Sequence, residues 1–215
     1  MDVGILPVKS LVVAKQRIAD RLGDEARRAL ASALLDDALA LCAAADWLRW
    51  WVATADPIVV RRAGSSGLGV LDDPGGGLNA ALRSAVSQLG AAGARSVTIV
   101  PADVPLGRRE DLLDLFDVGA TSDIALVPAL HDGGTNALYM SRPGLIEPAF
   151  GPLSLQTYLD TARRAKLRCS LLELPRMALD IDRVEDVAEF LERPEAAATS
   201  SGRVAAHWLE RARSS

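Results

Sequence analysis

Short apolar runs alternate along this chain with longer segments in which apolar residues recur at helical spacing. The short runs predict strands at 3–6, 50–54, 69–71, 96–100, 124–128, 137–140 and 169–174. The longer segments predict helices at 24–45, 78–89, 111–116, 153–165 and 184–191. The alternation of the two patterns predicts an α/β fold in which a mainly parallel central sheet is flanked by helices.

The pattern changes after residue 193. Residues 194–202 are polar and rich in Ala and Ser, which is typical of a linker, and 203–213 predict a last exposed helix. We therefore expect one domain at 1–193, followed by a linker and C-terminal helical tail at 194–215. A chain of 215 residues agrees with a single main domain.

Composition and charge narrow the function. The net charge of −4 gives no overall basic field that would attract nucleic acid, so a small anionic substrate would need local basic residues. No signal peptide and no apolar run long enough to span a membrane is recognised, so we expect a cytoplasmic protein. Cys42 and Cys169 lack metal-ligand spacing and are interpreted as reduced core thiols, and His131 and His207 as surface residues.

A basic segment follows the first predicted strand. It contains Lys9, Lys15 and Arg17, and cations at the end of a buried strand can hold a triphosphate and offset charge during phosphoryl transfer. The alternative is a solvated basic loop. The segment contains no glycine, so it is neither a Walker loop nor a dinucleotide-binding loop.

Three glycines precede the predicted helix at 78–89. Glycines allow backbone N–H groups to approach a ligand closely, and the amide of Asn79 has donors and an acceptor that suit a purine edge or a ribose. Gly77, Leu78 and Asn79 are therefore candidates for contact with a nucleotide base or its sugar. An ordinary turn with an Asn near a helix start is the alternative.

Carboxylates follow two other predicted elements. Asp103 comes after the strand at 96–100, where an ionised carboxylate can hold Mg²⁺ beside phosphates, although it also suits a turn before Pro105. Asp180 and Asp182 offer a second carboxylate to the same metal. Asp182 has capping-box spacing with Glu185, so the sequence leaves open which of the two Asp residues binds metal.

Two further segments place a hydroxyl group beside glycine. Gly134-Thr135-Asn136 and Gly151-Pro152-Leu153-Ser154 offer hydroxyl, amide and backbone donors that can bind a carboxylate or phosphate. Ser154 also fits the N-cap position of a helix, a function that is compatible with anion binding.

The order of these segments resembles the guanylyltransferases of coenzyme F420 biosynthesis. The shared run is Pro7-Val8-Lys9, Ala14-Lys15-x-Arg17, Gly77-Leu78-Asn79-x-Ala81, Ala102-Asp103-x-Pro105, Gly134-Thr135-Asn136-Ala137-Leu138, Phe150-Gly151-x-x-Ser154 and Asp180-Ile181-Asp182. The match spans about residues 3–192. Ser10 and Gln16 depart from the residues that are usual in the family, and the last 20 or so residues fall outside the match.

The resemblance implies a fold like that of the nucleotide-diphospho-sugar transferases, which is Rossmann-like. It implies that GTP is joined, with Mg²⁺, to phosphoenolpyruvate, or alternatively to 2-phospho-L-lactate. It further implies that Asp103 binds Mg²⁺, that Thr135, Gly151 and Ser154 contact the acceptor, and that the product passes to the next transferase of the pathway. A molybdenum-cofactor-type nucleotidyltransferase and a non-catalytic binding subunit are the remaining alternatives.

Overall fold

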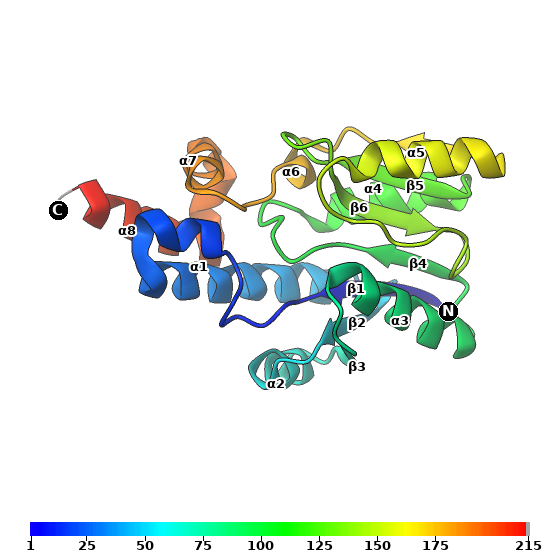
Figure 1. Ribbon diagram of the computed structural model, residues 1–215, viewed down its shortest axis with the longest axis horizontal. Coiled ribbons are helices and arrows are strands. Elements are labelled where there is room, and N and C mark those ends of the chain that lie inside the picture. Colours follow the sequence, from blue (N-terminus) through cyan, green and yellow to red (C-terminus); the bar gives the residue numbers. More distant parts are fainter. Residues whose placement is uncertain (214–215) are drawn as a thin grey trace.

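A seven-stranded sheet forms the centre of the protein in the computed structural model, which describes residues 1–213 (Figure 1). The strands are β1 (Asp2–Pro7), β2 (Arg49–Thr54), β3 (Gly69–Asp72), β4 (Ser96–Ile99), β5 (Ile124–Pro128), β6 (Thr135–Met140) and β7 (Cys169–Leu171). Their order is β3-β2-β1-β4-β6-β5-β7. Only β6 runs antiparallel to its neighbours, because the 129–134 turn makes a hairpin with β5, so the predicted mainly parallel sheet is confirmed.

Helices cover both faces of the sheet. They are α1 (Gln16–Ala44), α2 (Pro57–Ser65), α3 (Leu78–Ala91), α4 (Arg109–Ala120), α5 (Ser154–Ala165), α6 (Pro175–Ala178), α7 (Val184–Glu192), the 3₁₀ helix η1 (Pro194–Ala198) and α8 (Ser200–Arg213). The five predicted helices are present, while α2 and α6 were not predicted. Helix α2 begins with Pro57 directly after Asp56, in a segment for which no helix was predicted.

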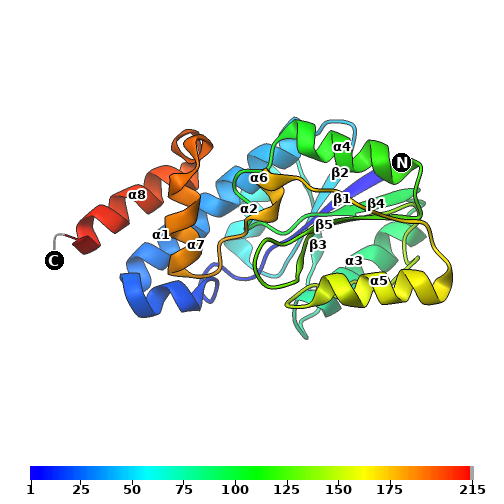
Figure 2. The same cartoon turned by 90° about the horizontal axis from the view of Figure 1, so that it is seen from above.

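Alternating residues of the strands pack into two separate hydrophobic cores, one on each face of the sheet. Val3 and Ile5 of β1 face α3 and α5, whereas Leu6 faces α1, α2 and α4. Figure 2 shows α4 on one side of the sheet and α3 and α5 on the other. Cys42 lies in the first core as a free buried thiol, as predicted.

Helix α1 bends at Gly23, whose φ of 83° interrupts the helical backbone. Only glycine adopts this conformation readily, and the straight part of α1 after it agrees with the predicted helix at 24–45. The residues before the bend, 16–22, form a short helical segment that was not predicted. Arg17 therefore lies on a helix and not in the basic loop.

The segment after residue 193 is ordered and packed, which corrects the predicted linker and exposed last helix. Residues 194–202 form η1 and the first turn of α8. Helix α8 lies beside α1 and α7 in both views (Figures 1 and 2), and Ala196, Ser201 and Ala205 are buried. Small Ala and Ser side chains, which the sequence analysis associated with a linker, are here the residues that allow close helix contact. Among the described residues, no helix has both the length and the apolar character needed to cross a membrane.

Candidate active site

A cavity of about 440 Å³ opens at the edge of the sheet where the parallel strands end. Because β6 is antiparallel, its first residues reach the same edge. The predicted site residues that line the cavity are Lys9, Lys15, Arg17, Leu78, Asp103, Thr135, Asn136, Gly151, Asp180 and Asp182. Gly77, Asn79 and Ser154 were also predicted but do not line it.

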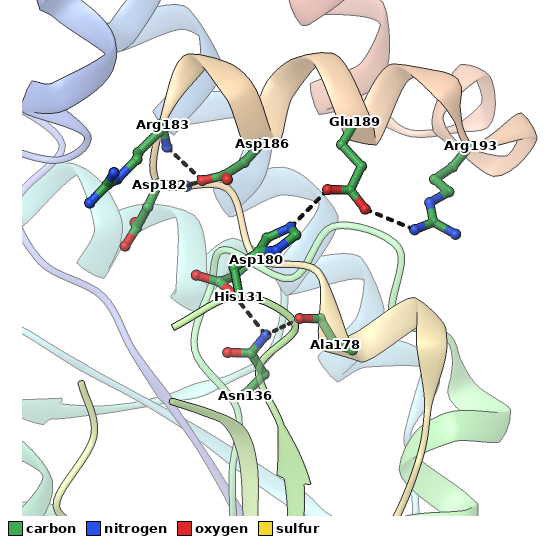
Figure 3. Close-up of polar contacts among 9 residues, drawn as sticks. All are labelled: His131, Asn136, Ala178, Asp180, Asp182, Arg183, Asp186, Glu189 and Arg193. Carbon is green, nitrogen blue, oxygen red and sulfur yellow. Dashed lines mark hydrogen bonds and ion pairs between the residues drawn. The ribbon is translucent and has the colours of Figure 1, made fainter. Parts of the chain in front are cut away.

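Three carboxylates meet at one side of the cavity. Asp103 follows β4, whereas Asp180 and Asp182 follow α6, and one oxygen from each lies within 4.8 Å of the others. Figure 3 shows the Asp180 and Asp182 side chains on one segment, with both carboxylates on the same side of it. Burial, with the nearby charge of Asp103, raises the pKa of Asp180 to about 6. A hard cation relieves such crowding of negative charge, and the all-oxygen donor set fits Mg²⁺.

The ammonium group of Lys15 lies between two of these carboxylates. Its Nζ is 2.7 Å from Asp103 Oδ2 and 2.7 Å from Asp182 Oδ1, and its side chain is only 12% exposed. Burial opposes the charged form of Lys15, but the two carboxylates outweigh it and raise the pKa of Lys15. Lys15 is therefore a charged partner of the carboxylates, while Lys9 and Arg17 are exposed beside the cavity.

Asn136 orients one of the carboxylates. Its Nδ2 donates to Asp180 Oδ1 at 3.0 Å and to the Ala178 carbonyl at 2.8 Å (Figure 3). Both amide hydrogens are thus used within the protein. The predicted amide donation from Asn136 to an acceptor substrate does not fit this arrangement, and only its carbonyl oxygen remains for a ligand.

The hydroxyl groups of Thr135 and Ser154 form a short chain. Ser154 is 2% exposed and its Oγ donates to Thr135 Oγ1 at 3.1 Å. Since Thr135 accepts from Ser154, its own hydrogen can be donated into the cavity. Ser154 is the first residue of α5 and not its N-cap, which is Leu153 with a φ of 60°. Ser154 therefore acts behind Thr135, in place of the predicted direct contact.

Asn79 is also used within the protein. Its Oδ1 accepts from the Phe150 N–H at 2.8 Å and its Nδ2 donates to the Phe150 carbonyl at 3.0 Å. This paired contact ties the start of α3 to the segment that presents Gly151. The geometry differs from the predicted contact of the Asn79 amide with a purine base.

The segment that carries Asp182 leads into helix α7, whose N-terminus is capped. The Asp186 carboxylate accepts from the N–H groups of Asp182 at 2.8 Å and Arg183 at 2.7 Å (Figure 3). The predicted capping pair of Asp182 and Glu185 is wrong, because α7 begins only at Val184. The Asp182 side chain is consequently free to pair with Lys15, so Asp180 and Asp182 both face the candidate metal site.

Sequence reasoning missed two residues that hold the basic loop. Arg27 is 1% exposed on α1 and donates to backbone carbonyls of the loop, and Asp56 accepts a loop N–H at 2.9 Å. The sequence does indicate the position of Asp56, since it directly precedes Pro57, and proline is common at the first position of a helix. Arg27 lies three and seven residues before Leu30 and Leu34 on the buried face of α1, so an arginine within the apolar stripe was a signal that the sequence analysis did not use.

The sequence matches the family described as "Guanylyl transferase CofC like" over residues 2–201. A protein from Chloroflexus aggregans named phosphoenolpyruvate guanylyltransferase is 34% identical over 200 residues, which cover 89% of this chain and 99% of the relative. A protein from Phenylobacterium zucineum named 3-phospho-D-glycerate guanylyltransferase is 35% identical over 199 residues, which cover 90% of this chain and 91% of the relative.

A crystal structure from Desulfovibrio desulfuricans G20, which bears the name nucleotide-diphospho-sugar transferase, has the same fold. Its TM-score is 0.79 with 16% sequence identity, and the match covers 100% of this chain and 98% of the other. The nucleotide-diphospho-sugar transferase fold expected from the motifs is thereby confirmed. Since the family match extends over nearly the whole chain, this protein belongs to the CofC-like guanylyl transferase family.

Proposed function

We propose that this protein joins GTP to phosphoenolpyruvate, giving enolpyruvyl-diphospho-guanosine and pyrophosphate in coenzyme F420 biosynthesis. One observation supports this more than any other. A cluster of carboxylates with a buried lysine shares a single cavity with the Thr135 hydroxyl and the glycine backbone at Gly151. In such a cavity, the carboxylates and the lysine can bind a metal-bound polyphosphate, while the hydroxyl and backbone groups can bind a small acidic acceptor.

Asp103, Asp180 and Asp182 would hold Mg²⁺ in this proposal. When bound, Mg²⁺ supplies positive charge beside the phosphates. Lys9 and Arg17 are exposed near the carboxylates and would attract the triphosphate. Lys15 would keep the Asp103 and Asp182 side chains together and present a third positive charge to the leaving pyrophosphate.

The transfer needs no general base from the protein. The phosphate of the acceptor is already anionic near neutral pH, so one of its oxygens attacks the α-phosphorus of GTP directly. The bond from the α-phosphorus to the bridging oxygen breaks, and pyrophosphate leaves opposite the attacking oxygen. The contribution of the chain is to bring two anions together in the correct orientation.

The acceptor is bound, in this proposal, by Thr135 and by backbone groups near Gly151. Gly151 has a φ of 129°, which lets its backbone face the cavity without a side chain in the way. The Thr135 hydroxyl, fixed by Ser154, would donate to the acceptor carboxylate or phosphate. The Gly77–Leu78 backbone is proposed to contact the guanosine, because Leu78 lines the cavity at the start of α3.

The choice of phosphoenolpyruvate over 3-phosphoglycerate rests on chemistry, since relatives named for these two acceptors are 34% and 35% identical to this chain. 3-Phosphoglycerate has an additional hydroxyl, and leaving such a group unpaired costs about 1–3 kcal/mol. 2-Phospho-L-lactate has the same carboxylate and phosphate but a tetrahedral carbon with a methyl group where phosphoenolpyruvate is planar, so some cross-reactivity is expected. The product is then consumed by a transferase that attaches the acid to a deazaflavin.

Pyrophosphate release from the purified protein tests the proposal. GTP and Mg²⁺ are held constant while phosphoenolpyruvate, 2-phospho-L-lactate and 3-phosphoglycerate are compared by kcat/KM. We expect the highest value for phosphoenolpyruvate. A higher value for either other acid would change the acceptor, and CTP- or molybdopterin-dependent release would instead favour the molybdenum-cofactor type of enzyme. No release with any pair would favour a non-catalytic binding subunit.

A further inference from the structure

The basic loop at 8–15 depends on bonds from the rest of the protein. Within it, the N–H groups of Val13 and Ala14 donate to the Ser10 carbonyl at 3.1 and 3.0 Å. Val12 and Val13 are 60% and 59% exposed, so burial of the loop side chains at its tip does not hold it in place. Val8 and Leu11 pack on the first core, and beyond them the loop is fixed over the cavity by bonds to its backbone.

Arg27 supplies most of this fixation. Its Nη1 donates to the Ala14 carbonyl at 2.7 Å and to the Leu11 carbonyl at 3.1 Å, while Nε donates to Asp24 Oδ1 at 2.7 Å. A buried guanidinium has fixed donor directions, so it can hold two carbonyl groups of one loop at a set spacing. Asp24 balances its charge from the same helix.

The Leu11 peptide is held from the opposite side as well. Its N–H donates to Asp56 Oδ2 at 2.9 Å, while Arg27 binds its carbonyl. Leu11 is thereby fixed between α1 and the start of α2. The other carbonyl held by Arg27 belongs to Ala14, which directly precedes the lysine in the carboxylate cluster.

Lys15 itself has a conformation that needs support. Its φ of 57° is left-handed, which is unfavourable for a residue with a Cβ atom. The Arg27 bond fixes the peptide before Lys15, and Asp103 and Asp182 fix its ammonium group. The backbone and the tip of Lys15 are thus held by separate groups.

We propose that Arg27 is a positioning residue for guanylyl transfer. Through the carbonyls of Leu11 and Ala14, it holds the basic loop in the shape that directs Lys9 and Lys15 into the cavity. The effect of Arg27 on catalysis rests on the proposed function. The fixation of the loop itself stands on the hydrogen bonds alone.

Arg28→Met is the matched control for Arg27→Met. Arg28 is the next residue of α1 and also pairs with Asp24, but its side chain is 64% exposed and its ion pair stays within its own helix. Both variants lose one arginine and one trypsin site. Arg27→Lys is the second variant, because it keeps the charge but cannot hold two carbonyls at a fixed spacing.

The first measurement is native trypsin cleavage after Lys9, Lys15 or Arg17, with the cut sites identified by mass. We expect cleavage to be about tenfold faster in Arg27→Met than in Arg28→Met, because cleavage at these sites requires the loop to open. Melting temperatures are recorded in parallel, and cleavage is measured well below them. Equal cleavage in the two folded variants would overturn the proposal.

The second measurement is the Kd of a fluorescent GTP analogue together with kcat and KM. Arg27→Met and Arg27→Lys are expected to raise the Kd and KM for GTP and to lower kcat by about 10- to 100-fold. KM for phosphoenolpyruvate should change much less, because its groups lie across the cavity. Free guanidinium at low millimolar concentration should partly restore GTP binding to Arg27→Ala.

The outcomes separate the two proposals. If the wild-type protein binds no GTP, the proposed function fails, while the trypsin comparison still tests whether Arg27 fixes the loop. If Arg27→Met does not fold, Arg27→Lys decides: wild-type cleavage and GTP affinity in that variant contradict the positioning role. Equal losses of affinity for GTP and phosphoenolpyruvate would indicate general destabilisation and also contradict it.

Discussion

Replacing Asp103 with Asn removes a negative charge from the carboxylate cluster and leaves the size of the side chain almost unchanged. Asp103 Oδ2 accepts from Lys15 at 2.7 Å, and its other oxygen is available to a cation. We expect Asp103→Asn to reduce the rate of pyrophosphate release about 10²-fold or more, as when a major electrostatic group is removed from an active site. Circular dichroism establishes folding. Near-normal turnover in the folded variant would exclude a catalytic function for Asp103.

Lys15 gives a second prediction at this scale, because its positive charge lies directly beside two of the carboxylates that would hold a metal and opposes the binding of a free cation. Lys15→Met is expected to weaken GTP binding, yet to bind Mn²⁺ without nucleotide about tenfold more tightly than the wild type. Mn²⁺ binding is measured by electron paramagnetic resonance.

Lys9→Met is the control for this second prediction. Lys9 also lowers the pKa of Asp182, but only through its charge and not through a hydrogen bond. An equal gain in Mn²⁺ affinity in Lys9→Met and Lys15→Met would show that the effect reflects general charge. A wild-type Mn²⁺ affinity in Lys15→Met would contradict competition between Lys15 and the metal.

Single side chains also mark the limit of sequence reasoning. Asp103 was found because it follows a buried strand, and Asp180 and Asp182 because they offer a second carboxylate to the same metal; the structure brings the three together. Asn79 and Asn136 were assigned to substrates, but their amides bind Phe150 and Asp180 instead. An amide fits a ligand and a backbone equally well, so only the three-dimensional structure distinguishes the two uses.

At the scale of elements, the strands were predictable because buried β-branched runs have few alternative structures. The helical segment at 16–22 and α2 were not, since both are short and their apolar faces depend on neighbouring elements. Helix α2 nevertheless affects the site. Its N-cap, Asp56, binds the N–H groups of Ile58 at 2.8 Å and Leu11 at 2.9 Å with separate oxygens.

The Asp56 contacts predict a pH dependence. Burial alone raises the pKa of Asp56, but hydrogen bonds from the Ile58 and Leu11 N–H groups outweigh it and lower the pKa below the ordinary value of 3.8. The stabilisation is therefore present above pH 3.8 and is lost as the pH falls through the folded pKa. Asp56→Asn keeps one acceptor oxygen for the helix but loses the bond to Leu11.

Urea unfolding from neutral to acidic pH tests this dependence. We expect Asp56→Asn to be less stable than the wild type by about 1 kcal/mol at pH 7. The difference should shrink only as the pH falls below 3.8 and through the lower folded pKa, where the wild-type carboxyl itself becomes protonated. A difference that stays constant down to the most acid pH at which both proteins fold would show that the Asp56 charge does not contribute.

At the scale of the whole molecule, the C-terminal helix supports the site from behind. A third core joins Ile18 and Leu34 of α1, Ala205 of α8, and Leu179 and Ile181. The last two residues flank Asp180, so the segment that carries two of the three carboxylates is packed on the same core as the tail. Residues 194–213 are consequently part of the body that holds the carboxylates, although we retain 1–193 as the proposed catalytic unit.

Asp37 connects this tail to α1 and gives the last prediction. Its carboxylate accepts from the N–H groups of Ser200 and Ser201 at 2.7 and 2.8 Å and from Ser201 Oγ at 2.5 Å. An acidic residue of one helix thus binds the N-terminus of another, where the exposed N–H groups and the helix dipole favour negative charge. Asp37→Asn should lower the free energy of unfolding by about 1–2 kcal/mol.

The neighbouring residue Asp36 is the control for this prediction. Its side chain is 55% exposed and pairs with Arg62 at the surface, so Asp36→Asn should change stability by no more than about 0.5 kcal/mol. Equal effects of the two substitutions would mean that the contact with α8 contributes little. Asp37 itself does not line the cavity. If Asp37→Asn also raises KM for GTP while Asp36→Asn does not, loosening of the third core has displaced Asp180 and Asp182, which are packed on it through Leu179 and Ile181.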